Sequence, residues 1–148
     1  MQKISKHIKE TGEIARLFFE AILKKSKHKK GATVVALSGD LGAGKTAFTQ
    51  YVAKHLGVTS KITSPTFVIL KKYPIKKSKH YTFLIHIDAY RLTHEEDLSP
   101  LKWNELISDN KHIIFIEWPE NVAKAIPPDA TRVTISHMKD GHRKLELQ

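Results

Sequence analysis

The stretch at residues 34–49, VVALSGDLGAGKTAFT, decides the fold. It opens with a short apolar run, breaks into a glycine-rich turn and continues as a helix-forming segment. The turn carries the pattern G-x-x-x-x-G-K-[ST], with its fixed positions at Gly39, Gly44, Lys45 and Thr46. Because the pattern follows a strand-like run and precedes a helix-like one, it predicts a phosphate-binding P-loop.

Each residue type in this turn suits phosphate binding. Gly39, Gly42 and Gly44 let the backbone amides turn toward an anion where a Cβ would obstruct them. The helix that follows presents its positive end to the same anion. Lys45 can then reach the β- and γ-phosphates, and the Thr46 hydroxyl can ligate Mg²⁺ between them. The alternative is a glycine-rich turn with a solvent-exposed lysine, which the complete motif disfavours.

Length and composition limit the class of protein. With 148 residues, 41% of them hydrophobic, the chain is expected to form one domain, residues 1–148, around one core. No apolar run approaches the roughly 18 residues of a membrane span. There are no cysteines, so disulfides, thiolate nucleophiles and thiolate metal sites are excluded. Charged residues near the start interrupt any signal-peptide core, and we expect a cytoplasmic protein without membrane contact.

The chain is strongly basic, with a formal net charge of +10. Such an excess attracts nucleic acid or an acidic protein surface through counterion release. Charge runs are more often solvated loops, and few aromatic residues interleave with these, so tRNA contact through the lysine-rich loops is the weaker alternative. Much of the excess lies in two runs, Lys24, Lys25, Lys27, Lys29 and Lys30, then Lys71, Lys72, Lys76, Lys77 and Lys79.

Helical periodicity occurs on both sides of the predicted P-loop. Apolar residues at helical spacing predict an amphipathic helix at residues 13–24, with Thr11 as its cap. A second helix is expected at about residues 45–56, ending at Gly57. The polar segment at residues 93–108 is expected to be peripheral and helical in parts, with Thr93 and Glu96 as a capping box.

The strand pattern completes the predicted fold. Asp140-Gly141 between two alternating segments predicts a terminal β-hairpin. The predicted class is α/β, a P-loop NTPase-like three-layer sandwich whose central sheet is mainly parallel, with antiparallel strands added at the C-terminus. Strands are expected at residues 33–37, 67–73, 81–88, 112–117, 131–137 and 143–147.

Two acids follow strand-like runs and are candidate site residues. Glu117 ends an apolar run in the manner of a Walker-B strand, which makes it the expected partner of Thr46 and Mg²⁺. Asp88 ends another run, where α/β sheets gather their ligands, although it can equally cap the next turn. His86 is expected to be a structural hydrogen-bonding residue and not a base. The loop at residues 64–67 is either a switch that senses phosphate or a capped turn before a strand.

Four motifs together resemble one family. They are GDLGAGKT at residues 39–46, SPTF at 64–67, HIDAYRL at 86–92 and EWPE at 117–120. In this order they are similar to the TsaE family, formerly YjeE, the small P-loop ATPase of bacterial tRNA threonylcarbamoyladenosine (t6A) synthesis. The resemblance implies an ATP- and Mg²⁺-dependent ATPase that binds the TsaB/TsaD heterodimer and drives its cycle without itself forming the modification.

The resemblance also implies roles for single residues. Lys45, Asp88 and Glu117 are the implied catalytic residues, with Thr46, Asp88 and Glu117 serving the metal. The division of labour between the two acids stays open. The family often has a Glu-Leu and a glycine-containing helix where this chain has residues 97–100, DLSP, so the resemblance implies no partner contact for this segment. The implied nucleotide-binding residues are Asp40, Leu41, Gly42, Ala43, Gly44, Lys45, Thr46, Ala47, Thr66 and Trp118.

Two other functions share the P-loop. A small P-loop kinase needs an acceptor pocket and usually an arginine-rich lid, whereas this chain has four arginines and no insertion that would form one. A basic nucleic-acid-binding module would hold the nucleotide as a structural ligand. The ATPase is the preferred prediction because the other three motifs accompany the P-loop.

Overall fold

Within the described part of the chain, seven strands form one sheet in the order β1-β7-β6-β2-β5-β4-β3. The computed structural model describes residues 1–26, 29–65 and 67–148. The strands are β1 (Gln2–Ser5), β2 (Thr33–Ser38), β3 (Leu70–Pro74), β4 (Phe83–Asp88), β5 (His112–Glu117), β6 (Thr131–His137) and β7 (Arg143–Leu147). The helices are α1 (Ile8–Ser26), α2 (Lys45–His55), η1 (Glu95–Leu101), α3 (Trp103–Ser108) and η2 (Pro119–Ala125).

The centre of the sheet is parallel and its edges are antiparallel. Strand β2 pairs in parallel with β5 and with β6, and β5 pairs in parallel with β4. The pairs β3–β4, β6–β7 and β1–β7 are antiparallel. This confirms the predicted α/β class, with two refinements. The first strand of the C-terminal hairpin, β6, is parallel to the centre, and the sequence did not predict the edge strand β1.

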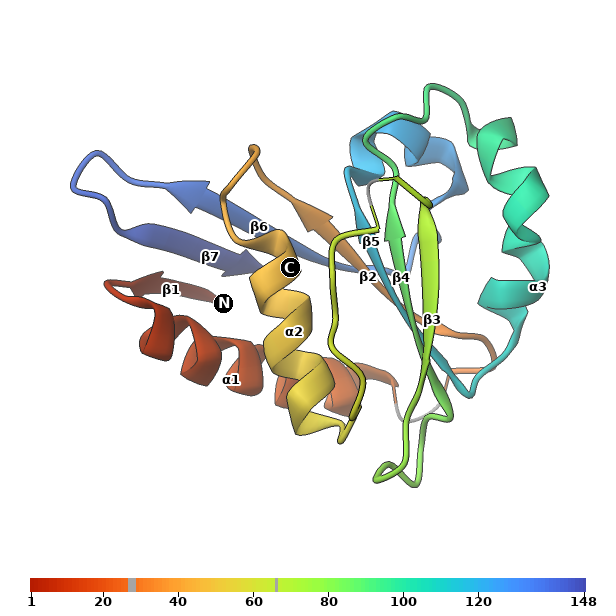
Figure 1. Cartoon of the computed structure of the whole chain (residues 1–148), viewed down its shortest axis with the longest axis horizontal. Helices are drawn as coiled ribbons and strands as arrows, with labels where there is room; N and C mark the ends of the chain where they lie inside the picture. Colours follow the sequence, from red (N-terminus) through yellow and green to blue (C-terminus); the bar gives the residue numbers. More distant parts are fainter. Residues whose placement is uncertain (27–28, 66) are drawn as a thin grey trace.

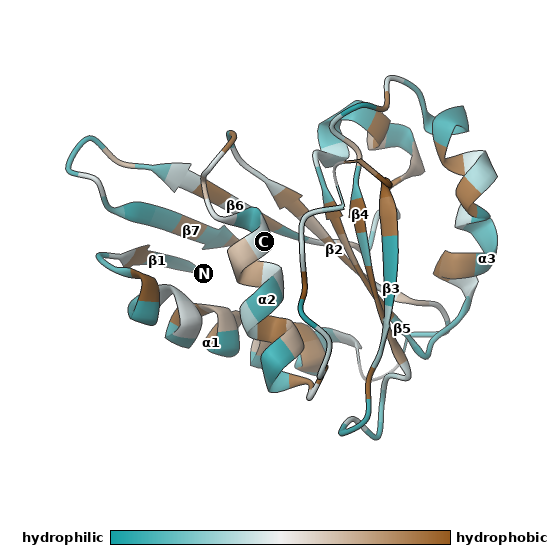
Figure 2. Cartoon of the chain, in the orientation of Figure 1, coloured by the Kyte–Doolittle hydropathy of each residue, from teal (hydrophilic) through white to brown (hydrophobic). Residues whose placement is uncertain are grey.

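Two layers of helices cover the sheet, as Figure 1 shows, with α1 and α2 on one face and α3 with the 3₁₀ segments on the other. Alternate side chains of β2 pack against the two helical layers. Val35 and Leu37 pack against α1 and α2. Val34 and Ala36 pack against the layer on the other face. Burial on both faces explains why β2 and β5 are apolar along most of their length (Figure 2).

The first helix begins five residues before the predicted start, at Ile8, so the expected Thr11 cap is wrong. Thr11 lies inside the helix, where its hydroxyl pairs with Ser5 Oγ at 2.6 Å. Glu10 accepts a hydrogen bond from the Lys6 backbone amide at 2.7 Å and so caps the first turn. Gly12 does not interrupt the helix. A Cβ there would lie 2.8 Å from the Tyr51 ring of α2, so the glycine lets α1 and α2 approach closely.

Three other predicted boundaries move. Strand β3 begins at Leu70 and not at residue 67, because Val68 and Ile69 donate to the Pro65 carbonyl in a turn. Strand β4 begins at Phe83, two residues later than expected. Asp97, and not Glu96, caps the segment after Thr93, since its Oδ2 accepts from the backbone amides of residues 93 and 94 at 2.9 and 3.1 Å. These bonds hold the Asp97 pKa below its usual value.

Among the residues that the structure describes, no helix has both the length and the apolarity that crossing a bilayer requires.

Gly39 joins β2 to the P-loop, and a substitution there tests the close packing of β6 against this loop. Its φ is 149°, and a Cβ there would lie 2.2 Å from the Ile135 carbonyl oxygen of β6. Gly39→Ala must push β6 away from the sheet centre, and we expect it to lower the free energy of unfolding by at least about 2 kcal/mol in urea denaturation.

Gly42→Ala is the matched control in the same loop. Gly42 has a φ of 76°, but nothing lies within 4 Å of an added Cβ. Only backbone strain opposes the change, so we expect a loss of about 1 kcal/mol. Equal stability of the wild-type and Gly39→Ala proteins would contradict the described packing of β6 on the P-loop.

Candidate nucleotide-binding site

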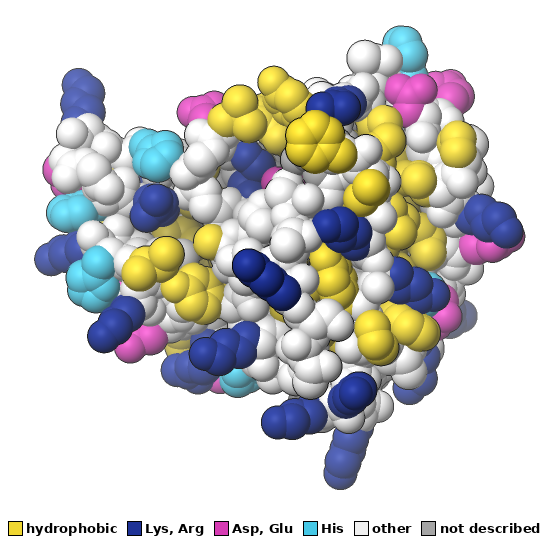
Figure 3. Space-filling view, viewed as in Figure 1, with side chains coloured by type: hydrophobic (Ala, Val, Ile, Leu, Met, Phe, Trp, Pro, Cys, Tyr) yellow, Lys and Arg dark blue, Asp and Glu magenta, His cyan; other side chains and the backbone are white. Residues whose placement is uncertain are grey.

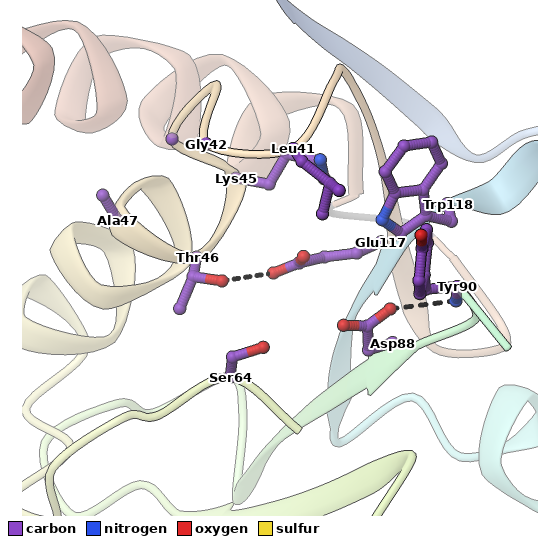
Figure 4. Close-up of a pocket in the computed structure, with 11 residues that line it drawn as sticks. Leu41, Gly42, Lys45, Thr46, Ala47, Ser64, Asp88, Tyr90, Glu117 and Trp118 are labelled. Carbon is purple, nitrogen blue, oxygen red and sulfur yellow. Dashed lines mark hydrogen bonds between the residues drawn. The ribbon is translucent and has the colours of Figure 1, made fainter. Parts of the chain in front are cut away.

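A pocket opens at the carboxyl ends of the central strands, where α/β sheets hold their ligands. The parallel register aligns Leu37 of β2, Asp88 of β4 and Glu117 of β5 at this edge. The turn after β2 leads into α2, which begins at Lys45. Figure 4 shows Thr46, Ser64, Asp88 and Glu117 pointing into a common space. The lining residues are Leu41, Gly42, Gly44, Lys45, Thr46, Ala47, Ser64, Asp88, Tyr90, Glu117 and Trp118.

Most of the residues predicted from the sequence meet in this pocket. Asp40 and Ala43 belong to the same turn but do not line it, because the Ala43 side chain is buried beneath the loop. The predicted Thr66 lies outside the described residues. Ser64, the first residue of the loop that was interpreted as either a phosphate-sensing switch or a capped turn, lines the pocket. Tyr90 lines it without having been predicted as a site residue, although it belongs to the HIDAYRL motif. The sequence offered one signal for Tyr90, which is its place two residues after Asp88, at the end of a predicted strand.

Lys45 is the cation of the pocket. Its Nζ donates to the carbonyl oxygens of Gly39 at 2.5 Å and Asp40 at 2.9 Å. The same ammonium lies 4.4 Å from the centroid of the Trp118 ring, a cation–π contact. Trp118 reaches this position from a left-handed backbone conformation with φ of 57°. The turn therefore holds its lysine with carbonyl groups and an aromatic face, and an anionic phosphate would be a stronger partner for it than either.

Glu117 connects the P-loop helix to the sheet. The Thr46 hydroxyl donates to Glu117 Oε1 at 2.8 Å, as Figure 4 shows. The same oxygen is 2.8 Å from His86 Nε2. Glu117 is only 4% exposed, and a buried carboxylate depends on such hydrogen bonds. The expected pairing of Thr46 with the acid that ends β5 is thus present, and so is the expected structural hydrogen bond of His86.

The structure places Asp88 where both interpretations of its position apply. Its Oδ1 accepts a hydrogen bond from the Tyr90 backbone amide at 2.9 Å, so it caps the turn after β4. It also lines the pocket beside Glu117. The Tyr90 ring packs on Trp118 with 5.2 Å between centroids, which closes one wall (Figure 4). The two interpretations of Asp88 are therefore compatible.

The terminal hairpin braces the P-loop from outside, which the sequence did not indicate. Arg143 of β7 donates from Nε to the Ala43 carbonyl at 3.1 Å. The His137 ring of β6 lies with Nε2 3.2 Å from the Gly42 carbonyl oxygen. Both carbonyls are thereby held on the outer side of the loop. The C-terminal strands thus help to fix the loop conformation.

The oxygen donors suit a magnesium–phosphate complex better than a protein-only metal centre. Thr46, Asp88 and Glu117 offer a hydroxyl and two carboxylates, the hard ligands that Mg²⁺ prefers. Within the described part of the chain, no three His, Asp or Glu side chains gather into a metal cluster of their own. Mg²⁺ usually takes its remaining ligands from phosphate and water, so the residues present fit it.

The site has the parts of a P-loop nucleotide-binding protein. They are a strand, a glycine-rich turn that enters a helix, and an acid on a neighbouring strand that accepts a hydrogen bond from the first hydroxyl of that helix. The family model for "Threonylcarbamoyl adenosine biosynthesis protein TsaE" matches residues 5–145. The chain belongs to the TsaE family. Its function therefore lies in the biosynthesis of the tRNA modification threonylcarbamoyladenosine.

Individual relatives agree with this assignment. The TsaE protein of Rickettsia prowazekii is 34% identical over 136 residues, which are 91% of this chain and 85% of that protein. The TsaE protein of Bacillus subtilis is 33% identical over 116 residues, which are 78% of this chain and 69% of that one. The crystal structure of Bacillus subtilis YdiB superimposes with a TM-score of 0.72 at 27% identity, covering 98% of this chain and 82% of that one.

Proposed function

We propose that this chain binds ATP with Mg²⁺ and hydrolyses it, and that it does so as a subunit acting with the TsaB/TsaD heterodimer in t6A synthesis. The observation that carries the proposal is the 2.8 Å bond between Thr46 Oγ1 and Glu117 Oε1. It brings together at the mouth of the turn two oxygen atoms that would serve as ligands in a P-loop magnesium site. Phosphate binding by the backbone amides and Lys45 would take place beside them.

Each residue then has a defined task. The amides of the turn and the positive end of α2 would bind the β- and γ-phosphates. Lys45 would exchange its carbonyl partners for phosphate oxygens. Thr46 and Glu117 would hold Mg²⁺, whose charge, when bound, stabilises the transferring phosphoryl group. Asp88, held by its bond to the turn after β4, would orient water in or beside the metal shell. Trp118 and Tyr90 would shield Lys45 from solvent.

Water is the acceptor that the pocket favours. A kinase surrounds the transferring phosphoryl group with cationic side chains and shuts out water. No arginine lines this pocket among the described residues. Arg91 lies 5.0 Å from the centroid of the Phe67 ring instead, and Arg16 pairs with Glu20 on the surface of α1. These positions support hydrolysis over phosphoryl transfer to a metabolite.

The loop between α2 and β3 supports coupling to a partner. Ser64 lines the pocket, whereas Phe67, three residues later, is 85% exposed. Ile69 has a φ of 66°, a strained conformation for a β-branched residue. A segment that touches the nucleotide site at one end and presents apolar side chains at the other is suited to report the state of the phosphate.

The nucleic-acid-binding alternative has less support. Lys71 donates to the Thr63 hydroxyl, and Lys72 lies 4.1 Å from the centroid of the Phe83 ring, so part of the second lysine run has structural partners. Figure 3 shows lysine and arginine side chains scattered over the visible face and not gathered into one patch. We propose tRNA contact only for the exposed lysines of the β3–β4 connection, Lys76, Lys77 and Lys79.

Substitutions at Lys45 and Glu117 test the ATPase. Glu117→Gln keeps a similar shape but weakens the metal ligand, so we expect ATP turnover to fall at least about 100-fold. Lys45→Ala removes the phosphate cation, and nucleotide binding should fall with turnover. Lys54→Ala, an exposed lysine of the same helix, is the control and should retain full activity. Phosphate release with and without TsaB/TsaD is the measurement, and unchanged turnover in both site variants would refute the assignment.

The partner is tested by capture of purified TsaB/TsaD on the immobilised chain. We expect binding to differ between ATP, ADP and nucleotide-free conditions, because γ-phosphate and Mg²⁺ would order the site that the α2–β3 loop contacts. The Lys45→Ala protein should lose this nucleotide dependence. Failure to bind under all three conditions would contradict the proposed partnership.

A further inference from the structure

His86 is a buried polar residue that hydrophobic packing does not explain. It is 0% exposed, in the middle of β4, opposite Phe115 of β5. Its Nδ1 is the one buried side-chain nitrogen or oxygen of the described chain that has no hydrogen-bond partner. Burying a polar atom without a partner costs free energy, which an apolar side chain at this position would avoid. We therefore expect the imidazole to make an interaction that an apolar side chain could not make.

That interaction is the hydrogen bond between His86 Nε2 and Glu117 Oε1. Because a carboxylate can only accept, Nε2 carries the proton and Nδ1 presents its lone pair. With Nε2 as the donor, the His86 side chain acts as a fixed hydrogen-bond donor to Glu117. Because the His86 side chain is fully buried within the sheet, its ring has little freedom to rotate away from Glu117.

Three elements thus converge on one carboxylate oxygen. Thr46 from α2 and His86 from β4 both bond to Oε1 of Glu117 on β5. Thr46 would ligate a metal ion through a lone pair of its hydroxyl oxygen and could keep its O–H on Glu117, but its position would then also depend on the metal. His86 has no such second task, so its bond to Glu117 can persist with or without the metal.

We propose that His86 is a positioning residue, which holds the Glu117 carboxylate in place for the magnesium–nucleotide complex. The inference rests on the proposed function, since it concerns the same metal site. Side chains that orient a metal ligand in this way typically contribute about 10- to 100-fold to metal affinity. His86 would have this effect without touching the nucleotide.

Two amide substitutions separate positioning from simple packing. Glutamine carries its amide nitrogen as far along the side chain as Nε2, so His86→Gln can still donate to Glu117. Asparagine is equally polar but ends nearer the backbone, at the level of Nδ1, so His86→Asn cannot. His112→Leu is the control, because His112 is also a buried histidine and begins β5 at the opposite end from Glu117.

The measurement is the equilibrium affinity for the fluorescent analogue mant-ATP, titrated with Mg²⁺ and repeated in EDTA. We expect His86→Asn to require about 10-fold more Mg²⁺ or above, His86→Gln to stay within about threefold of wild type, and His112→Leu to be unchanged. In EDTA all four proteins should bind mant-ATP alike, because the phosphate-binding turn is intact. Circular dichroism establishes that each variant is folded.

Two outcomes would overturn the inference. One is a wild-type Mg²⁺ requirement in folded His86→Asn, and the other is an equal loss in the Gln and Asn variants. If the Asn variant does not fold, His86→Gln decides alone, and a loss of about 10-fold in Mg²⁺ affinity there counts against positioning by the Nε2 donor. A wild-type protein whose mant-ATP binding ignores Mg²⁺ would overturn the proposed function itself, and this inference with it.

Discussion

The nucleotide site depends on one carboxylate oxygen, Oε1 of Glu117, which accepts hydrogen bonds from Thr46 and from His86. These bonds join the start of α2 and the middle of β4 to the end of β5. They are possible only because β2, β5 and β4 are adjacent and parallel, so that their carboxyl ends meet at one edge. The sheet order is therefore part of the chemistry. The outer strands contribute indirectly, because the β6–β7 hairpin holds the P-loop carbonyls of Gly42 and Ala43.

The elements around this edge could be predicted because their signals are local. Strands β2 and β5 are buried on both faces and are nearly continuous apolar runs, and the terminal hairpin alternates around Asp140-Gly141. The misplaced boundaries have two kinds of cause. At α1 a contact between distant residues is involved, because Gly12 accommodates the Tyr51 ring. At β3 and after Thr93 the cause is a local turn or cap that the residue pattern did not specify. Phe67 looked like a strand residue, but it belongs to an exposed turn.

The site followed the same division. Lys45 and Thr46 are fixed by the motif, and Asp88 and Glu117 by their positions at strand ends, so the sequence alone identified all four. That Thr46 and His86 share a single oxygen of Glu117 depends on helix placement and strand register, which no local pattern specifies. The hydrogen bond from Arg143 to the Ala43 carbonyl joins residues 100 positions apart, so the sequence pattern could not predict it either. Motifs thus identified the residues that meet at the pocket, and the structure identified what holds them.

The proposed site requires that Thr46 and Glu117 act as one unit in binding magnesium and nucleotide. A double-mutant cycle with Thr46→Val and Glu117→Gln, read out as Mg²⁺-dependent mant-ATP affinity, tests it most directly. If the two residues share one metal site, the double variant should lose less than the sum of the single losses, with a coupling free energy above about 1 kcal/mol. Losses that add to within about 0.5 kcal/mol would show that the residues act independently, and would contradict the account.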